Sequence, residues 1–130
     1  MAEGVAAVLE VKSDLCAQWE QVENTVEKVK SLSRKYKDAP SNTIPTFAVG
    51  YVGYKTMEGL EQRMRQTEVS CCPDGVLVLE DPGLFIYSRS YKPRVSKQGV
   101  QALYGLITEI SFECVGWSSE RPSFESYLET

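Results

Sequence analysis

Residues 5–13 read Val-Ala-Ala-Val-Leu-Glu-Val-Lys-Ser, a short apolar run that ends in a glutamate, one spacer and a lysine. The run predicts a β-strand over residues 5–11, apolar on both faces and therefore an inner strand of a sheet covered on both sides. Side chains two apart on a strand share a face, so Glu10 and Lys12 are expected side by side. Ionisable side chains are almost never fully buried unless they form an ion pair or have a functional role. The pair therefore predicts either a metal-and-water site or a charged strand end that meets solvent.

The composition favours one ordinary domain over residues 1–130. A chain of 130 residues with 42% hydrophobic and 25% charged residues can bury a core and is not typical of disorder. No apolar run approaches the roughly 20 residues of a membrane-spanning helix. The net charge of -4 argues against a general nucleic-acid coat, although it is compatible with a local basic groove.

The absence of histidine excludes Ser-His-Asp and Cys-His catalysis and histidine-ligated zinc. The four cysteines, at positions 16, 71, 72 and 114, lack the C-x-x-C spacing of a zinc ribbon. The acidic start Met-Ala-Glu-Gly is not typical of a signal peptide. We therefore expect a reduced protein of the cytoplasm.

Helical and strand patterns alternate after the first strand. They predict, in order, a helix over 13–36, a strand over 46–54, a helix over 56–67, a hairpin of strands 75–80 and 84–88, and a helix over 99–115. Ser13 or Asp14 is expected to cap the first helix and Thr56 the second. This order predicts an α/β fold with a mixed central sheet flanked by helices.

Two apolar stripes are expected to face the core. In the first helix the stripe is Leu15, Trp19, Val22, Val26, Val29 and Leu32; in the last helix it is Val100, Leu103, Leu106, Ile107, Ile110 and Cys114.

A basic, proline-containing loop is expected between the hairpin and the last helix. It carries Arg89, Lys92, Arg94 and Lys97, with Tyr87 and Tyr91 interleaved. These side chains could grip a phosphate backbone and stack on bases, or the loop could simply be solvated.

The Glu10-Val-Lys12-Ser13 strand that runs directly into a long helix resembles the second half of the PD-(D/E)XK, or restriction-endonuclease-like, nuclease core. Within that superfamily the chain is most similar to an uncharacterised nuclease-like domain family of bacteria, which the later hairpin and last helix also resemble. The resemblance implies that Glu10 is a ligand of Mg²⁺ or Mn²⁺ and that Lys12 orients or deprotonates the attacking water. It further implies that Gln18 or Gln21 completes the site, and that DNA is the substrate of a metal-dependent endonuclease or other phosphodiesterase.

The resemblance covers only the C-terminal two-thirds of such a core. The family's metal-binding aspartate lies upstream of the E-x-K strand, where this chain has only residues 1–4, with Glu3 as the sole acid. We therefore expect a core that lacks its N-terminal helix and hairpin and is incomplete or inactive as an isolated chain. Either the chain is a fragment or a natural truncation, or the missing strands come from a second chain.

Two functions remain open. One is a nuclease-like domain with a half-site for divalent-metal-dependent phosphodiester cleavage. The other is a non-catalytic α/β module that forms a homodimer, or binds a partner, through an open sheet edge.

Overall fold

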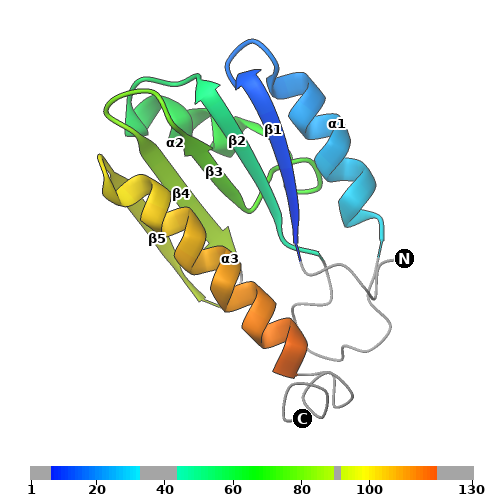
Figure 1. The fold of residues 1–130 in the computed structure, drawn as a ribbon. Helices are drawn as coiled ribbons and strands as arrows, with labels where there is room; N and C mark the ends of the chain where they lie inside the picture. Colours follow the sequence, from blue (N-terminus) through cyan, green and yellow to red (C-terminus); the bar gives the residue numbers. More distant parts are fainter. Residues whose placement is uncertain (1–6, 33–43, 90–91, 120–130) are drawn as a thin grey trace.

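The computed structural model describes residues 7–32, 44–89 and 92–119, and it confirms an α/β fold with a mixed sheet flanked by helices. The elements are β1 (Val8–Asp14), α1 (Trp19–Lys30), β2 (Thr46–Val52), α2 (Met57–Gln66), β3 (Gly75–Val78), β4 (Leu84–Arg89), β5 (Lys92–Gln98) and α3 (Gln101–Ser119). The strands lie in the order β1-β2-β3-β4-β5 (Figure 1). The first three are parallel, and β4 and β5 continue the sheet in antiparallel pairing.

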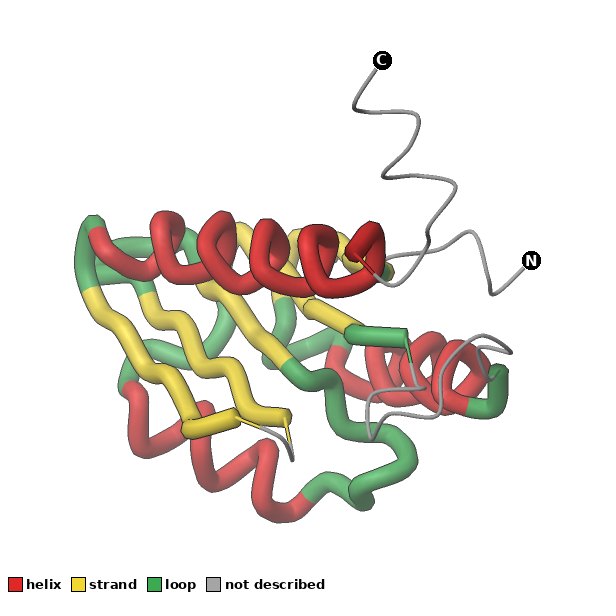
Figure 2. The backbone as a smooth tube through the Cα atoms, turned by 90° about the horizontal axis from the view of Figure 1, so that it is seen from below, coloured by secondary structure: helices red, strands yellow, loops and turns green. Residues whose placement is uncertain are grey.

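The helices form one layer on each face of the sheet (Figure 2). Helices α1 and α2 cover one face, over a core that includes Trp19, Leu60 and Ile86. Helix α3 packs on β3, β4 and β5 on the other face, over a second core that includes Phe47 and Phe85. The β1 and β2 part of that second face carries no helix among the described residues.

Strand β1 is an edge strand, so the prediction of an inner strand is wrong. It pairs only with β2 in the described part of the chain, and its residues alternate between partly buried and exposed. Leu9 is 44% exposed and Val11 is 55% exposed. An apolar run indicates that both faces of a strand suit burial, but it does not report whether a neighbouring strand or a covering helix is present.

The connection from β1 to α1 also differs from the prediction. Helix α1 begins at Trp19, and its N-cap residue, Gln18, makes no side-chain capping bond. The Asp14 carboxylate instead accepts hydrogen bonds from the backbone N–H groups of Cys16 and Ala17, at 2.9 and 3.2 Å, so it stabilises a turn ahead of the helix. A capping residue and a turn residue carry the same signal in sequence.

The apolar stripe of α1 is buried at Leu15, Trp19, Val22 and Val26, as predicted, whereas Leu32 is 49% exposed. The predicted end of this helix, at residues 33–36, lies outside the described residues. The predicted cap of α2 is confirmed, because Thr56 Oγ1 accepts the N–H of Gly59 at 3.1 Å. The antiparallel pairing of β3 with β4 confirms the hairpin.

The expected basic loop does not form: Arg89 ends β4, and Lys92, Arg94 and Lys97 lie in strand β5, which pairs with β4. Lysine, arginine and proline are also the residues that protect an edge strand from further pairing, and this edge role explains the composition.

Helix α3 is rotated relative to the prediction. Val100, Leu103, Ile107 and Cys114 are exposed, whereas Ala102, Leu106, Glu109 and Glu113 are buried. The physical reason is charge on the sheet: Glu113 accepts a hydrogen bond from the Tyr87 hydroxyl and lies 3.8 Å from Arg89 Nε. A buried cation requires an anion nearby, and this requirement turns the glutamates inward.

One long-range hydrogen bond ties α1 to the end of α2. The Trp19 indole N–H donates to Thr67 Oγ1 at 3.0 Å in the core, and that hydroxyl donates to the Arg63 carbonyl at 2.8 Å. Thr67→Val removes the acceptor and leaves a buried donor unpaired, which should destabilise the protein by about 1–3 kcal/mol in chemical denaturation. Thr67→Ser keeps the hydroxyl and is the matched control. Equal stability of the valine and serine variants would contradict this role.

Candidate functional site

The structure brings together three of the predicted site residues, Glu10, Lys12 and Gln21. Glu10 and Lys12 point to the α1 side of β1, and the Lys12 ammonium lies 3.1 Å from Glu10 Oε1. The same ammonium donates to Gln21 Oε1, on α1, at 2.9 Å. Both charged side chains are about one-fifth exposed, at 18% for Lys12 and 23% for Glu10. The cluster is therefore a partly shielded ion pair with an amide beside it.

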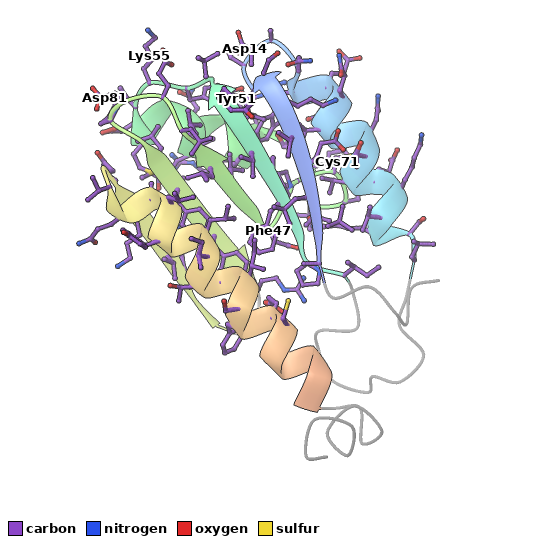
Figure 3. The ribbon with its side chains drawn as sticks, viewed as in Figure 1. Asp14, Phe47, Tyr51, Lys55, Cys71 and Asp81 are labelled. Atoms are coloured by element: carbon purple, nitrogen blue, oxygen red, sulfur yellow. The ribbon has the colours of Figure 1, made fainter. Side chains whose placement is uncertain are left out.

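Gln18 does not belong to this cluster. Its Oε1 accepts hydrogen bonds from the Ser13 hydroxyl at 3.1 Å and from the backbone N–H of Asp14 at 2.9 Å. It therefore holds the turn between β1 and α1, which Figure 3 shows at the labelled Asp14.

Glu10 does not belong to a cluster of metal-ligating side chains in the described residues. Across residues 7–32, 44–89 and 92–119 no three Cys, Asp or Glu side chains converge in a way that could hold a metal ion. A divalent ion takes about six or more oxygen ligands, and Glu10 with Gln21 would supply three at most. What the described residues show is thus an ion pair, in which Lys12 neutralises the Glu10 carboxylate.

A second polar cluster lies around Asp74, just before β3. Its Oδ2 accepts from the backbone N–H of Thr46 at 2.9 Å and from Arg89 Nη1 at 3.1 Å, and its Oδ1 lies 3.6 Å from Lys30 Nζ. Arg89 is only 7% exposed. The expectation that Arg89 contacts nucleic acid from a loop is therefore wrong: its guanidinium is a buried cation between Asp74 and Glu113.

The strand geometry separates the other predicted basic residues. Arg94 points to the α1–α2 face and pairs with Glu61 of α2. Lys97 lies on the α3 face, next to Gly105. The side chain of Lys92, like all of Tyr91, is outside the described residues. Because alternate residues of β5 face opposite ways, the four predicted cations do not form one patch.

A cavity of about 910 Å³ lies between the C-terminal ends of α1 and α2 and the sheet. Its lining includes four basic side chains and two carboxylates: Lys30, Arg65, Arg89, Arg94, Glu61 and Asp74. The sequence does not predict that Lys30 and Arg65 line a cavity, because a basic residue in the last turn of a helix is already explained by the helix dipole.

Comparisons with protein-family models, with curated protein sequences and with solved structures found no match. The resemblance to the PD-(D/E)XK superfamily therefore stays a prediction. No described helix has the length and apolar character that crossing a membrane requires.

Cys72 lines the same cavity, and burial raises the pKa of its thiol to about 11. At pH 8 its thiolate fraction is therefore on the order of 0.1%, and the thiolate is the reactive species. Iodoacetamide at pH 8 should label the exposed Cys16 and Cys114 well before Cys72, as peptide mass spectrometry would show. Urea-unfolded protein is the control, in which all four cysteines should react. Rapid labelling of Cys72 in the folded chain would contradict its burial.

Proposed function

We propose that the protein is an interaction module that binds an extended segment of a partner along the open edge of β1. The observation that carries this proposal is a seven-residue edge strand whose outer side has no neighbour among the described residues. An unpaired edge presents a row of backbone donors and acceptors that an incoming strand can satisfy.

The backbone geometry identifies which groups are open. The N–H of Val8 donates to the carbonyl of Pro45 at 2.9 Å, so Val8 directs its backbone groups toward β2. Backbone groups alternate in direction along a strand, so Glu10 and Lys12 share that orientation. Leu9 and Val11 direct theirs outward, toward the place of a partner strand.

The side chains of β1 also describe the partner. Glu10 and Lys12 lie on one face, and Leu9 and Val11 lie on the other. An antiparallel partner should carry a basic residue opposite Glu10 and an acidic residue opposite Lys12, with apolar residues on the other face. Residues 5–15 of this chain, when they run antiparallel about Val11, place Lys12 opposite Glu10, Glu10 opposite Lys12 and Val11 opposite Val11, with Ser13 opposite Leu9. A peptide of that sequence is therefore a suitable probe.

The peptide should slow the amide hydrogen exchange of Leu9 and Val11 and leave that of Glu10 and Lys12 almost unchanged. Nuclear magnetic resonance resolves this alternation residue by residue. Val11→Pro removes an outward N–H that β2 does not use, so the sheet should persist while peptide binding weakens about tenfold. Val11→Thr keeps the N–H and the β-branched shape, and it should bind like the wild type. Uniform exchange rates along β1, with or without peptide, would overturn the proposal.

A second candidate function is the nuclease-like half-site, which the Glu10–Lys12–Gln21 cluster favours. Residues directly opposite each other on paired strands have Cβ atoms about 5 Å apart. A strand bound at β1 could thus bring a second carboxylate next to Glu10. A metal held there would lower the pKa of a bound water for attack on a phosphodiester, and Lys12 would orient that water or its phosphate target.

If Glu10 binds a metal in the isolated chain, millimolar Mg²⁺ or Mn²⁺ should raise the melting temperature by a few degrees. An ion at tenfold its dissociation constant stabilises the folded state by about 1.4 kcal/mol. Glu10→Gln should remove the rise. Glu20→Gln, which changes an exposed carboxylate of α1, should leave it intact. If neither ion changes the melting temperature, Glu10 does not bind a metal in the isolated chain.

A further inference from the structure

Helix α3 is apolar on its outward side as well as toward the sheet. Val100, just ahead of the helix, is 83% exposed, Tyr104 is 66% exposed and Ile107 is 51% exposed. The only charged residues of α3 are Glu109 and Glu113, and both are buried. Large apolar side chains on the outer side of a helix are typical of a helix whose outer side is also covered.

The sheet beside α3 presents a matching apolar surface. The sheet register aligns Val11 with Val49, while Leu9 and Val11 of β1 and Tyr51 of β2 lie on the α3 side of the sheet. Leu79 continues this surface next to Tyr51, and its own side chain is 41% exposed. Figure 3 shows the labelled Tyr51 on β2, and this side chain is 62% exposed. We call this surface, made of Leu9, Val11, Tyr51 and Leu79, the β1–β2 face.

A hollow of about 450 Å³ joins the two surfaces. Its lining includes Leu77 and Leu79 from the sheet and Leu103 and Tyr104 from α3. The β1–β2 face is two strands wide, about 10 Å, because strands lie about 4.8 Å apart. Helices pack beside one another at 8–10 Å, so the β1–β2 face has the width of one more helix next to α3.

We propose that a second copy of this chain covers the β1–β2 face with the outer side of its own α3. The contact is reciprocal: each copy has one sheet face that no described element covers and one apolar helix surface to place on it. A two-fold dimer satisfies both requirements with the same pair of patches. The two α3 helices then lie side by side between two sheets. This surface is distinct from the β1 backbone edge of the proposed function.

The size of the patch fits a stable dimer. Large side chains present roughly 150–250 Å² when fully exposed. Eight such residues are between 41% and 83% exposed here: Leu9, Val11, Tyr51, Leu79, Val100, Leu103, Tyr104 and Ile107. They offer on the order of 800 Å² per copy, which is the contribution of one partner to an interface of standard size.

The chemistry of the patch favours a second copy over a charged ligand or nucleic acid. None of its eight residues is ionisable in the physiological range, and α3 has no charge on its outer side. Pairing of two β1 edges would not cover this face, because the added strand would extend the sheet and leave the same side chains exposed. Only a partner that packs on top of the β1–β2 face would therefore cover its apolar side chains.

Sedimentation velocity over a wide concentration range tests the proposal. The wild type should dimerise, and Ile107→Lys on α3 and Tyr51→Lys on β2 should each weaken the dimer by at least about tenfold. Both positions are exposed in the single chain, so the variants should keep their circular dichroism and melting behaviour. Gln62→Lys, at an exposed position of α2 on the opposite layer, is the matched control and should dimerise like the wild type.

A cross-link identifies the surface directly. In chains whose native cysteines are replaced by alanine, one copy carries Val11→Cys and the other carries Ile107→Cys. Mixing the two should give a disulfide-linked heterodimer under mild oxidation. A monomer at every concentration overturns the proposal. So does a dimer that survives both lysine variants but is lost in Val11→Pro, because that outcome assigns dimerisation to the β1 edge.

Discussion

The buried guanidinium of Arg89 determines much of this structure. It lies at the end of β4, 3.1 Å from an Asp74 oxygen, and its Nε lies 3.8 Å from a Glu113 oxygen. A cation in the core is strongly unfavourable unless anions and hydrogen bonds surround it. Asp74 and Glu113 meet this need from opposite directions, since one precedes β3 and the other belongs to α3. The charge thereby connects the start of the hairpin, the end of β4 and the last helix.

This constraint has a consequence on the outside of the molecule. To bring Glu109 and Glu113 to the sheet, α3 turns Leu103 and Ile107 toward solvent. The same helix covers β3 to β5, and nothing in residues 7–32, 44–89 and 92–119 forms a helix over β1 and β2 on that face (Figure 1). Apolar surface of this extent marks an interaction site in most soluble proteins. The two contacts that we propose therefore use adjacent surfaces: an extended strand at the edge of β1, and a helix on the β1–β2 face.

The local parts of the fold could be predicted from the sequence, and the long-range parts could not. The alternation of helices and strands, the Thr56 cap and the hairpin at Asp81-Pro82-Gly83 depend on neighbouring residues, and all three are confirmed. The edge position of β1 depends on the absence of a neighbour, which an apolar run does not encode. The rotation of α3 depends on Arg89, a residue in another element. The periodicity of apolar residues correctly placed Leu106 and Ile110 in the core but not Leu103 and Ile107.

The candidate site divides in the same way. The spacing of Glu10 and Lys12 predicted a shared face, and the ammonium and carboxylate do lie 3.1 Å apart. Gln21 joins them because α1 returns along β1. By contrast, the sequence predicts one basic loop over residues 89–97. In the structure Arg94 and Lys97 lie in β5, and the alternation of side chains along a strand directs them to opposite faces of the sheet. The cavity beside Lys30 and Arg65 is formed by segments that are far apart in the sequence, so no local sequence pattern predicts it.

The most direct test of the central claim, that the outer side of α3 and the β1–β2 face cover each other between copies, is hydroxyl-radical footprinting at low and high protein concentration. In the single chain Tyr51 is 62% exposed and Tyr104 is 66% exposed, so both should be oxidised readily in dilute solution. At high concentration both tyrosines should become protected together, while exposed side chains of α2 keep their rates. Oxidation of Tyr51 and Tyr104 at the same rate at every concentration would contradict the account.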